Sequence, residues 1–368
     1  MPMNAEEIGR YQRQLSLAGF GPEGQERLKA GSVLVVGAGG LGCPALLYLA
    51  AAGVGRIVIV DDDRVEVSNL HRQVLFTGED EGKSKAPAAA LRLRALNPLI
   101  TVEPRTERFT RANALNLVRS CDVVVDGSDN FATRYLVNDA CVMADRPFVY
   151  GAVQGFEGQV SVFNWRGGPT YRCLFPEPPE PGTVPNCAEG GVLGVLPGLV
   201  GTAQACEALK LLAGIGEPLS GRLLVWNALE MSPSLVTLRA DPRSRPILEL
   251  PPEGYGETCG VEEIVPPEEV DPEDVQREIA SGRPPQLIDV REGWERMLGA
   301  IKPSIHLPLG RLEQGDVSVL ARLDPAAPTV VYCAAGVRSL RGAYLLRELH
   351  GFRSATSLRG GYHRWNGD

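Results

Sequence analysis

Apolar runs alternate with helical patterns over the first 150 residues of the chain. The strand-like runs are short, continuous and rich in valine and isoleucine, which is typical of buried strands. Strands are expected within 32–42, at 56–61, near 100–104, within 121–130 and at 147–153, and helices at 41–52, 85–95 and 131–144. This alternation predicts an α/β domain with an open, mostly parallel sheet.

The pattern changes after residue 151. Residues 155–165 alternate like a strand, and residues 198–214 are typical of a helix that a glycine ends. Between them, residues 171–187 are rich in proline and have no regular period. A long irregular loop inside a compact domain is usually functional.

A second α/β pattern occupies the last 100 residues. Residues 241–268 are rich in proline, glycine and glutamate, which is typical of a linker. Beyond them, helices are expected near 272–280 and at 338–349, and strands at 286–291 and 329–333. We therefore predict a first domain at 1–245, a linker at 246–268 and a second, smaller α/β domain at 269–368.

Composition and charge narrow the class of protein. The 368 residues are 44% hydrophobic and 22% charged, and the formal net charge of −8 argues against nucleic acid or an anionic membrane as the main partner. No run reaches the ~18 apolar residues that cross a bilayer, and the polar N-terminus does not resemble a signal peptide. Eight scattered cysteines without a C-x-x-C pair indicate free thiols in a reducing cytoplasm.

Glycines after the first strand predict a nucleotide site. Gly37, Gly39 and Gly42 have the spacing of a dinucleotide-binding turn, with Gly40 between them. Such a turn directs backbone N–H groups and a helix N-terminus at a phosphate. Asp61 follows about 20 residues later, where related folds place a carboxylate on ribose hydroxyls. These features do not separate NAD from ATP.

The loops that follow favour ATP. The further candidate residues of this site are Asp63, Ser68, Asn69, Leu70, His71, Arg72, Gln73, Lys85, Asp129 and Asn130. In a doubly wound sheet these loops meet at the carboxyl ends of the strands, where ligands bind. Arginine and lysine suit a triphosphate and its departing pyrophosphate. Asp129 suits Mg²⁺, which bridges phosphate oxygens, and a hydride-transfer enzyme needs little of this.

The motifs GAGGLG, SNLHRQ and DGSDN, together with Lys85, resemble the ThiF/MoeB group of adenylating enzymes. These relatives of ubiquitin-activating enzymes adenylate the C-terminal glycine of a small ubiquitin-like protein, and the resemblance runs from residue 10 to about residue 240. It implies a Rossmann-like adenylation domain that uses ATP and Mg²⁺. It assigns nucleotide contacts to Gly40 and Asp61, phosphate contacts to Asn69, Arg72 and Lys85, magnesium to Asp129, and to Arg13 a contact with the partner subunit's ATP across a homodimer.

Cys187 lies in the proline-rich loop. Members of the fused type have a cysteine in this stretch that forms a thioester or a disulfide with the carrier protein, so the resemblance implies a catalytic role for Cys187. The alternative, a structural cysteine, stays open because a neighbouring base cannot be recognised from the sequence.

Zinc is not expected, although many relatives bind it with two C-x-x-C pairs. TYRC retains only Cys173, with Thr170 at the first position, and GETC retains only Cys259, with Gly256 at the first position. Structural zinc normally needs four Cys or His ligands. Cys173 and Cys259 are interpreted as remnants that would lie close together, with either a disulfide between them or no link.

The sequence TVVYCAAGVRS predicts a strand, a loop and a helix with Cys333 at the turn. Backbone N–H groups and a helix N-terminus stabilise an anionic sulfur, and Arg338 is expected to add positive charge. The spacing C-x₄-R, together with LIDVREGWE and IHLPLG, resembles the rhodanese family, whose cysteine carries a persulfide. The persulfide loop would comprise Cys333, Gly336, Arg338 and Ser339; the segment MLGAIKPS departs from the family pattern.

Two such sites on one chain resemble the fused adenylyltransferase–sulfurtransferases of the MoeZ type. The resemblance implies that the first domain activates a Gly-Gly-ended sulfur carrier as an acyl-adenylate and that sulfur from Cys333 gives a thiocarboxylate, for molybdopterin or related biosynthesis. An upstream sulfur donor such as a cysteine desulfurase would load Cys333. Three alternatives remain: an activator that works by thioester only, an NAD oxidoreductase, and a sulfur-relay protein without adenylation.

Overall fold

The computed structural model describes residues 3–178, 191–245, 247–251, 255 and 268–367. The chain divides into two compact units, Met1–Gly260 and Val261–Asp368, and each is described by itself. No helix within the described ranges is long and apolar enough to cross a membrane.

An eight-stranded sheet runs through the described part of the first unit, in the order β3-β2-β1-β4-β5-β6-β7-β8. Its strands are β1 Ser32–Val36, β2 Arg56–Val60, β3 Thr101–Arg105, β4 Val123–Asp126, β5 Phe148–Gln154, β6 Glu157–Phe163, β7 Arg222–Asn227 and β8 Ser232–Thr237. Strands β1 to β5 pair in parallel, and β5 to β8 pair antiparallel. The predicted α/β class with a mostly parallel sheet is confirmed for this unit.

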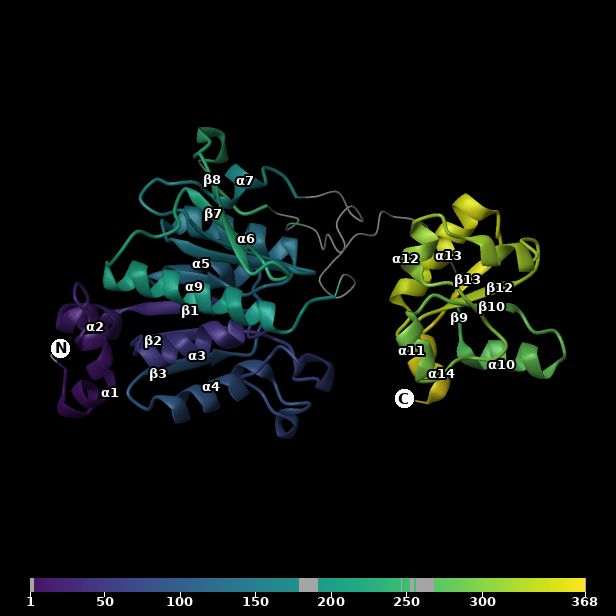
Figure 1. Ribbon diagram of the computed structural model, residues 1–368, viewed down its shortest axis with the longest axis horizontal. Helices are drawn as coiled ribbons and strands as arrows, with labels where there is room; N and C mark the ends of the chain where they lie inside the picture. Colours follow the sequence, from purple (N-terminus) through teal and green to yellow (C-terminus); the bar gives the residue numbers. More distant parts are fainter. Residues whose placement is uncertain (1–2, 179–190, 246, 252–254, 256–267, 368) are drawn as a thin grey trace. The chain divides into compact units, whose positions relative to one another are not determined.

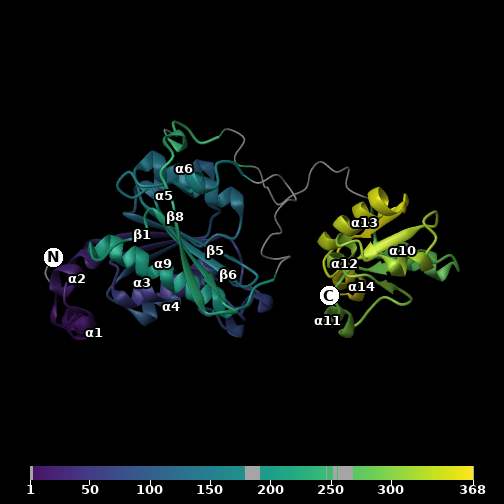
Figure 2. The same cartoon turned by 45° about the horizontal axis from the view of Figure 1, so that its top comes forward.

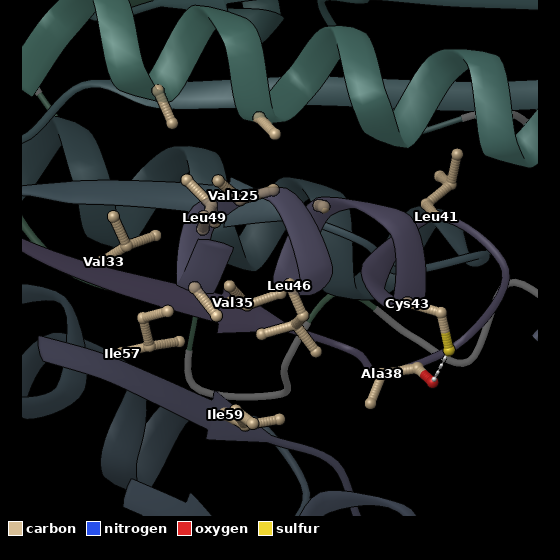
Figure 3. Close-up of a cluster of buried hydrophobic side chains, with 14 of the residues drawn as sticks. Val33, Val35, Ala38, Leu41, Cys43, Leu46, Leu49, Ile57, Ile59 and Val125 are labelled. Atoms are coloured by element: carbon tan, nitrogen blue, oxygen red, sulfur yellow. Dashed lines mark hydrogen bonds between the residues drawn. The ribbon is translucent and has the colours of Figure 1, made fainter. Parts of the chain in front are cut away.

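Helices cover both faces of this sheet (Figures 1 and 2). The described helices of this unit are α1 Ala5–Leu15, α2 Gly21–Ala30, α3 Gly42–Ala52, α4 Lys85–Leu96, α5 Arg111–Arg119, α6 Phe131–Ala144, α7 Tyr171–Leu174 and α9 Val195–Ala213. Strand β1 shows why two layers form. Val33 and Val35 pack into the core under α3, α4 and α9, whereas Leu34 and Val36 pack on the other face, under α5 and α6. Figure 3 shows the first of these cores.

Helices α1 and α2 have no counterpart in the sequence prediction. Helix α1 begins with a capping box in which Asn4 and Glu7 exchange side-chain-to-backbone hydrogen bonds. The amine of Lys29 lies 2.8 Å from the Glu7 carboxylate, and the Tyr11 hydroxyl accepts a hydrogen bond from the buried Asn97 amide. These contacts hold α1 against the rest of the unit. Helix α2 follows α1 and ends just before β1 begins, so α1 lies at the amino end of that strand.

The second unit contains a five-stranded parallel sheet among its described residues, in the order β11-β10-β12-β13-β9. Its strands are β9 Glu269–Val270, β10 Gln286–Asp289, β11 Ile305–His306, β12 Thr329–Tyr332 and β13 Ala355–Leu358, and its helices are α10 Pro272–Ala280, α11 Gly293–Met297, α12 Leu309–Glu313, α13 Val337–His350 and α14 Gly361–Asn366. Separate apolar cores lie on the two faces of the sheet. The prediction of a smaller α/β unit is confirmed.

The expected linker needs a correction where it is described. Leu250 is buried in the core that lies under α5 and α6. The Tyr255 hydroxyl donates a hydrogen bond to Asp139 of α6, and its ring stacks on Tyr135 at 6.2 Å between centroids. These two residues therefore belong to the packing of the first unit. The proline-rich composition of this segment does not indicate that its apolar side chains pack against the first unit.

Candidate active sites

Three loops meet where the strand order of the first sheet reverses direction. Strand β1 pairs with β2 on one side and with β4 on the other, so the segments after these strands leave the same edge. Ligands of open α/β sheets bind at such a switch point. Gly37–Gly42, Asp61 and the loop 127–130 are gathered here as the sequence predicts.

The glycines of the turn differ in how much space a side chain would have. Gly37 has a φ of +92°, and a Cβ at this position would lie 2.9 Å from the carbonyl oxygen of Gly127. A Cβ on Gly42 would lie 2.0 Å from the carbonyl oxygen of Gly37. By contrast, a Cβ on Gly39 would meet nothing nearer than Gln73 Nε2, at 3.8 Å. Gly37 and Gly42 close the turn, and Gly39 leaves open space in front of it.

Asp61 is held over the turn by backbone donors. Its Oδ2 accepts a hydrogen bond from Ala38 N at 2.7 Å, and its Oδ1 accepts one from Asp63 N at 2.9 Å. The Cys43 thiol donates to the Ala38 carbonyl at 3.2 Å (Figure 3). Burial raises the pKa of Asp61, and the Ala38 hydrogen bond opposes that shift. The carboxylate is therefore positioned to meet a ligand seated in the turn.

Two cations stand beside the turn, each aligned by a polar partner. The Lys85 amine lies 2.8 Å from Asp63 Oδ2; the Lys85 side chain is 6% exposed, whereas that of Asp63 is 69% exposed. Arg72 Nη2 donates to Asn69 Oδ1 at 3.1 Å. A Cβ on Gly40 would lie 3.4 Å from Arg72 Cγ, so the arginine stem passes over the turn.

The other residues of this loop support Arg72 or face solvent. Asn69 Oδ1 also accepts from Gln73 Nε2 at 3.1 Å, and Gln73 Oε1 is buried without a hydrogen-bond partner among the described residues. His71 Nε2 lies 2.7 Å from Arg72 Nη1, and burial lowers its pKa. Ser68 is exposed and Leu70 is partly buried. The structure thus brings the sequence-predicted loop residues to one place.

In the loop after β4, one polar residue is exposed and others make hydrogen bonds that hold the backbone. Asp129 is exposed, whereas Asn130 caps α6 by accepting a hydrogen bond from Thr133 N at 2.9 Å. Asp126, which the sequence analysis missed, is completely buried. Its Oδ1 accepts hydrogen bonds from Ser128 N and Oγ at 3.0 and 2.6 Å. It shapes the turn that presents Asp129.

Arg13 does not lie in the site of its own protomer. It is exposed on α1, at the amino end of β1, whereas the glycine turn lies at the carboxyl end. Cys187 falls outside the described residues.

The surroundings of Cys173 differ from a zinc site. Its sulfur accepts hydrogen bonds from the backbone N–H groups of Thr170 and Asp241, at 3.3 and 3.2 Å, and lies 3.2 Å from Ser244 Oγ. Burial raises the pKa of Cys173, but these hydrogen bonds outweigh it and lower the pKa overall. In the part of the chain that the structure describes, one thiol, two hydroxyls and N–H donors gather here, and this set does not fit structural zinc, which needs Cys or His ligands.

Among the described residues, Cys173 contacts a segment that the sequence analysis did not single out. Asp241 and Ser244, which are spaced like the two cysteines of a C-x-x-C pair, both contact the Cys173 sulfur. Cys259, which the sequence analysis paired with Cys173, lies outside the described residues. The D-x-x-S spacing of Asp241 and Ser244 is not a recognisable motif, so this pair is identified only by its contact with Cys173.

The second candidate site lies between β12 and α13. Cys333 is buried, and its sulfur accepts a hydrogen bond from Gly336 N at 3.1 Å; Gly336 has a φ of +100°. Ser339 Oγ donates to the Gly336 carbonyl at 2.7 Å. Tyr362 N donates to the Cys333 carbonyl at 2.7 Å. These hydrogen bonds to the loop carbonyls hold the turn in which the Gly336 N–H donates to the sulfur.

Arg338 interacts electrostatically with Cys333, and its guanidinium is also paired with an acid. Its guanidinium donates two hydrogen bonds to Glu295, with Nη1–Oε2 at 2.7 Å and Nη2–Oε1 at 2.6 Å. The Glu295 side chain is 10% exposed. The charge of Arg338 is therefore offset, and Glu295 is a residue of the site that the sequence analysis missed.

Family models match both units. The ThiF family matches residues 11–246, and the rhodanese-like domain matches residues 271–368. The chain belongs to the ThiF family. It carries a rhodanese-like domain after the ThiF region, as the sequence motifs indicated.

Full-length relatives share both regions. The chain is 45% identical over 373 residues to the probable adenylyltransferase/sulfurtransferase MoeZ of Mycobacterium tuberculosis, covering 99% of this chain and 94% of that protein. It is 43% identical over 379 residues to the adenylyltransferase and sulfurtransferase MOCS3 of Sus scrofa, covering 94% and 82%. The chain is thus an enzyme of the fused adenylyltransferase–sulfurtransferase type, which disfavours hydride transfer.

Two further similarities cover about two thirds of the chain. The chain is 59% identical over 248 residues to the sulfur carrier protein adenylyltransferase of Thermus thermophilus, covering 66% of this chain and 92% of that protein. The crystal structure of Escherichia coli MccB with ATP superposes with a TM-score of 0.55 at 23% identity, covering 65% of this chain and 73% of that chain. The latter shows a shared fold.

Proposed function

We propose that this enzyme adenylates the C-terminal glycine of a small ubiquitin-like sulfur carrier protein and that sulfur from Cys333 then gives a thiocarboxylate. The observation that carries the proposal is the gathering of Asp61, Arg72 and Lys85 at the Gly37–Gly42 turn. The name of the Thermus thermophilus relative supports a sulfur carrier as the partner. The pathway would be molybdopterin or related biosynthesis.

In the first step a carboxylate oxygen of the carrier attacks the α-phosphorus of ATP. The bond to pyrophosphate breaks, and pyrophosphate leaves with the electron pair. The attacking group is already an anion, so no general base is needed, and catalysis rests on alignment and charge stabilisation. Asp61 would hold the ribose, and Arg72 and Lys85 would bind phosphate oxygens. The exposed Asp63 holds the Lys85 amine in place until a phosphate replaces it.

The residues at the end of β4 fit a magnesium ion carried by ATP. Mg²⁺ takes one or two carboxylates together with phosphate oxygens. The exposed Asp129 carboxylate is available for this on the turn that Asp126 shapes. When bound, the ion neutralises phosphate charge.

In the second step the outer sulfur of a Cys333 persulfide would attack the carbonyl carbon of the acyl-adenylate, AMP would leave, and the carrier would be joined to Cys333 through an acyl disulfide. A thiolate would then attack the Cys333 sulfur, the S–S bond would break, and the thiocarboxylate would leave with its electron pair. The disulfide that remains on Cys333 would be reduced by an external thiol. The Gly336 N–H near the sulfur supports Cys333 as the residue that holds the persulfide. Cys187 would either attack the adenylate first or later resolve a disulfide with the carrier. Both routes stay open.

The same proposal extends to the assembly of the enzyme. A homodimer is supported by Arg13, which is exposed at the end of the sheet away from its own glycine turn and would serve the partner subunit's ATP. We propose residues 1–245 as the adenylation domain and 269–368 as the rhodanese domain, cytoplasm as the location, and a cysteine desulfurase as a sulfur donor.

ATP–pyrophosphate exchange with and without a Gly-Gly-ended carrier from the same genome tests the first step. Carrier-dependent exchange is expected, followed by an oxygen-to-sulfur mass change on the carrier when Cys333 is loaded with sulfur. Exchange without a later mass change would favour an activator that works by thioester only. No exchange with any carrier would refute adenylation and favour a sulfur relay.

A further inference from the structure

Helix α7 is tied to the first unit through adjacent residues. Tyr171 is fully buried, and its backbone N–H donates a hydrogen bond to Asn138 Oδ1 at 2.8 Å. The Arg172 guanidinium donates two hydrogen bonds of 2.8 Å to the Asp139 carboxylate. Both partners belong to α6, which holds the short helix in place. The next residue, Cys173, contacts instead the segment 241–245, which follows β8.

The Cys173 sulfur joins two pairs of residues that have the same spacing. Thr170 N donates to the sulfur at 3.3 Å, and Asp241 N donates to it at 3.2 Å. Thr170 Oγ1 and Ser244 Oγ lie 3.5 and 3.2 Å from it. Thr170 and Cys173 are three positions apart in the sequence, as are Asp241 and Ser244. Four positions with the spacing of two C-x-x-C pairs therefore meet around one sulfur, although only one of them is a cysteine.

Hydrogen bonds close this group without a metal ion. Ser244 Oγ donates to the Asp241 carbonyl oxygen at 2.7 Å, so the Cys173 thiol can donate to Ser244 Oγ while its sulfur accepts from the two N–H groups. The Asp241 carboxylate is bound elsewhere, because it accepts from Arg243 N at 2.9 Å and from Arg243 Nη2 at 2.7 Å. Among the described residues, the group offers a metal one thiol, whereas structural zinc takes four Cys or His ligands.

We propose that these residues form a metal-free cross-link, which ties the segment 241–245 to α7 in place of the zinc that two C-x-x-C pairs would bind. The restraint comes from the N–H and hydroxyl groups that surround the sulfur at 3.2–3.5 Å. Only the side chains of Thr170, Asp241 and Ser244 separate this group from a set of four thiols. The proposed reaction does not use these residues, so the inference does not depend on it.

The first measurement is the metal content and the thiol state of the full-length enzyme as purified. Elemental analysis should find far less than one zinc ion per chain, and EDTA should leave the Tm of the first unit unchanged. Peptide mass spectrometry without reductant should find Cys173 as a free thiol. Stoichiometric zinc whose removal lowers the Tm, or a disulfide at Cys173, would overturn the proposal.

Cys173→Ala tests the restraint that the hydrogen bonds supply. The variant leaves the N–H groups of Thr170 and Asp241 without the sulfur acceptor, so the Tm of the first unit should fall by about 2–4 °C. Cys206→Ser is the matched control, because Cys206 is an exposed cysteine on α9, and this variant should keep the wild-type Tm. If Cys173→Ala also keeps it, the sulfur does not hold the segment and the proposal fails.

A four-thiol variant tests whether the four positions converge. Thr170→Cys/Asp241→Cys/Ser244→Cys, with Cys173 kept, should bind one zinc ion per chain. Zinc should raise the Tm of this variant, and EDTA should reverse the rise. The control carries Cys173→Ala in addition; with only three thiols it should bind zinc at least about tenfold more weakly.

The outcomes separate this inference from the proposed function. A folded four-thiol variant that binds no zinc would show that the four positions do not converge, and would overturn the cross-link. If that variant does not fold, the metal content of the wild-type enzyme and the Tm of Cys173→Ala still decide the question. Absence of ATP–pyrophosphate exchange in the wild-type enzyme would refute adenylation and leave the cross-link unaffected.

Discussion

The glycine turn predicts opposite effects for two alanine substitutions that look alike in the sequence. In Gly42→Ala the new Cβ would lie 2.0 Å from the Gly37 carbonyl oxygen, so backbone must move. Such overpacking costs about 3 kcal/mol, and the better helix propensity of alanine returns up to about 1 kcal/mol. The net loss of about 2 kcal/mol lowers the Tm of a unit of this size by about 4–8 °C.

Gly39→Ala is the matched variant. Its Cβ would have no neighbour within 3.8 Å, so the free energy of unfolding should stay the same or rise by up to about 1 kcal/mol. The methyl group would fill the space that the turn leaves open for phosphate. We expect the KM for ATP to rise about tenfold, which corresponds to about 1.4 kcal/mol of lost binding.

Thermal unfolding and ATP–pyrophosphate exchange measure the two effects separately. A Tm of Gly42→Ala equal to that of wild type would show that the close contact relaxes without cost. A Gly39→Ala enzyme with wild-type KM for ATP would show that the nucleotide does not approach this side of the turn. Either result refutes the corresponding half of the reasoning.

Three further predictions address the separate sites. Asp129→Ala should abolish pyrophosphate exchange and leave sulfur transfer to cyanide intact, and Cys333→Ala should do the reverse; thiocarboxylate formation at full rate by the latter, with unchanged cyanide-reactive sulfur, contradicts the assignment. Burial raises the pKa of Asp289, but Arg291 outweighs it and lowers the pKa overall. The stabilisation is therefore present above the ordinary aspartate pKa and lost as the pH falls through the lowered value, so acid unfolding of the second unit should depend less on pH in Asp289→Asn. Mixed dimers of Arg13→Ala and Lys85→Ala subunits should regain exchange activity that neither variant has alone, because one of their two sites is intact; no regain refutes a role of Arg13 across the dimer.

The local pattern predicts most elements of the two sheets because their strands are buried on both faces. Valine-rich runs such as β1 and β4 need no knowledge of their partners, and α6 begins and ends where its sequence indicates. Helices α1 and α2 were missed because they are polar along much of their length. Their stability comes from distant contacts, such as the one between Tyr11 and Asn97, which no local window contains.

The sequence by itself determined the chemistry of both sites: a glycine turn with an acid after the next strand, cations in the following loop, and a cysteine before a helix. Only the tertiary structure decided how charge is distributed there. Glu295 and Arg338 are 43 residues apart and Cys173 and Ser244 are 71 apart, so their pairing depends on how strands and loops are ordered in space. Spacing in the sequence reports which groups a site can use, and packing decides which of their charges and hydrogen bonds are already satisfied.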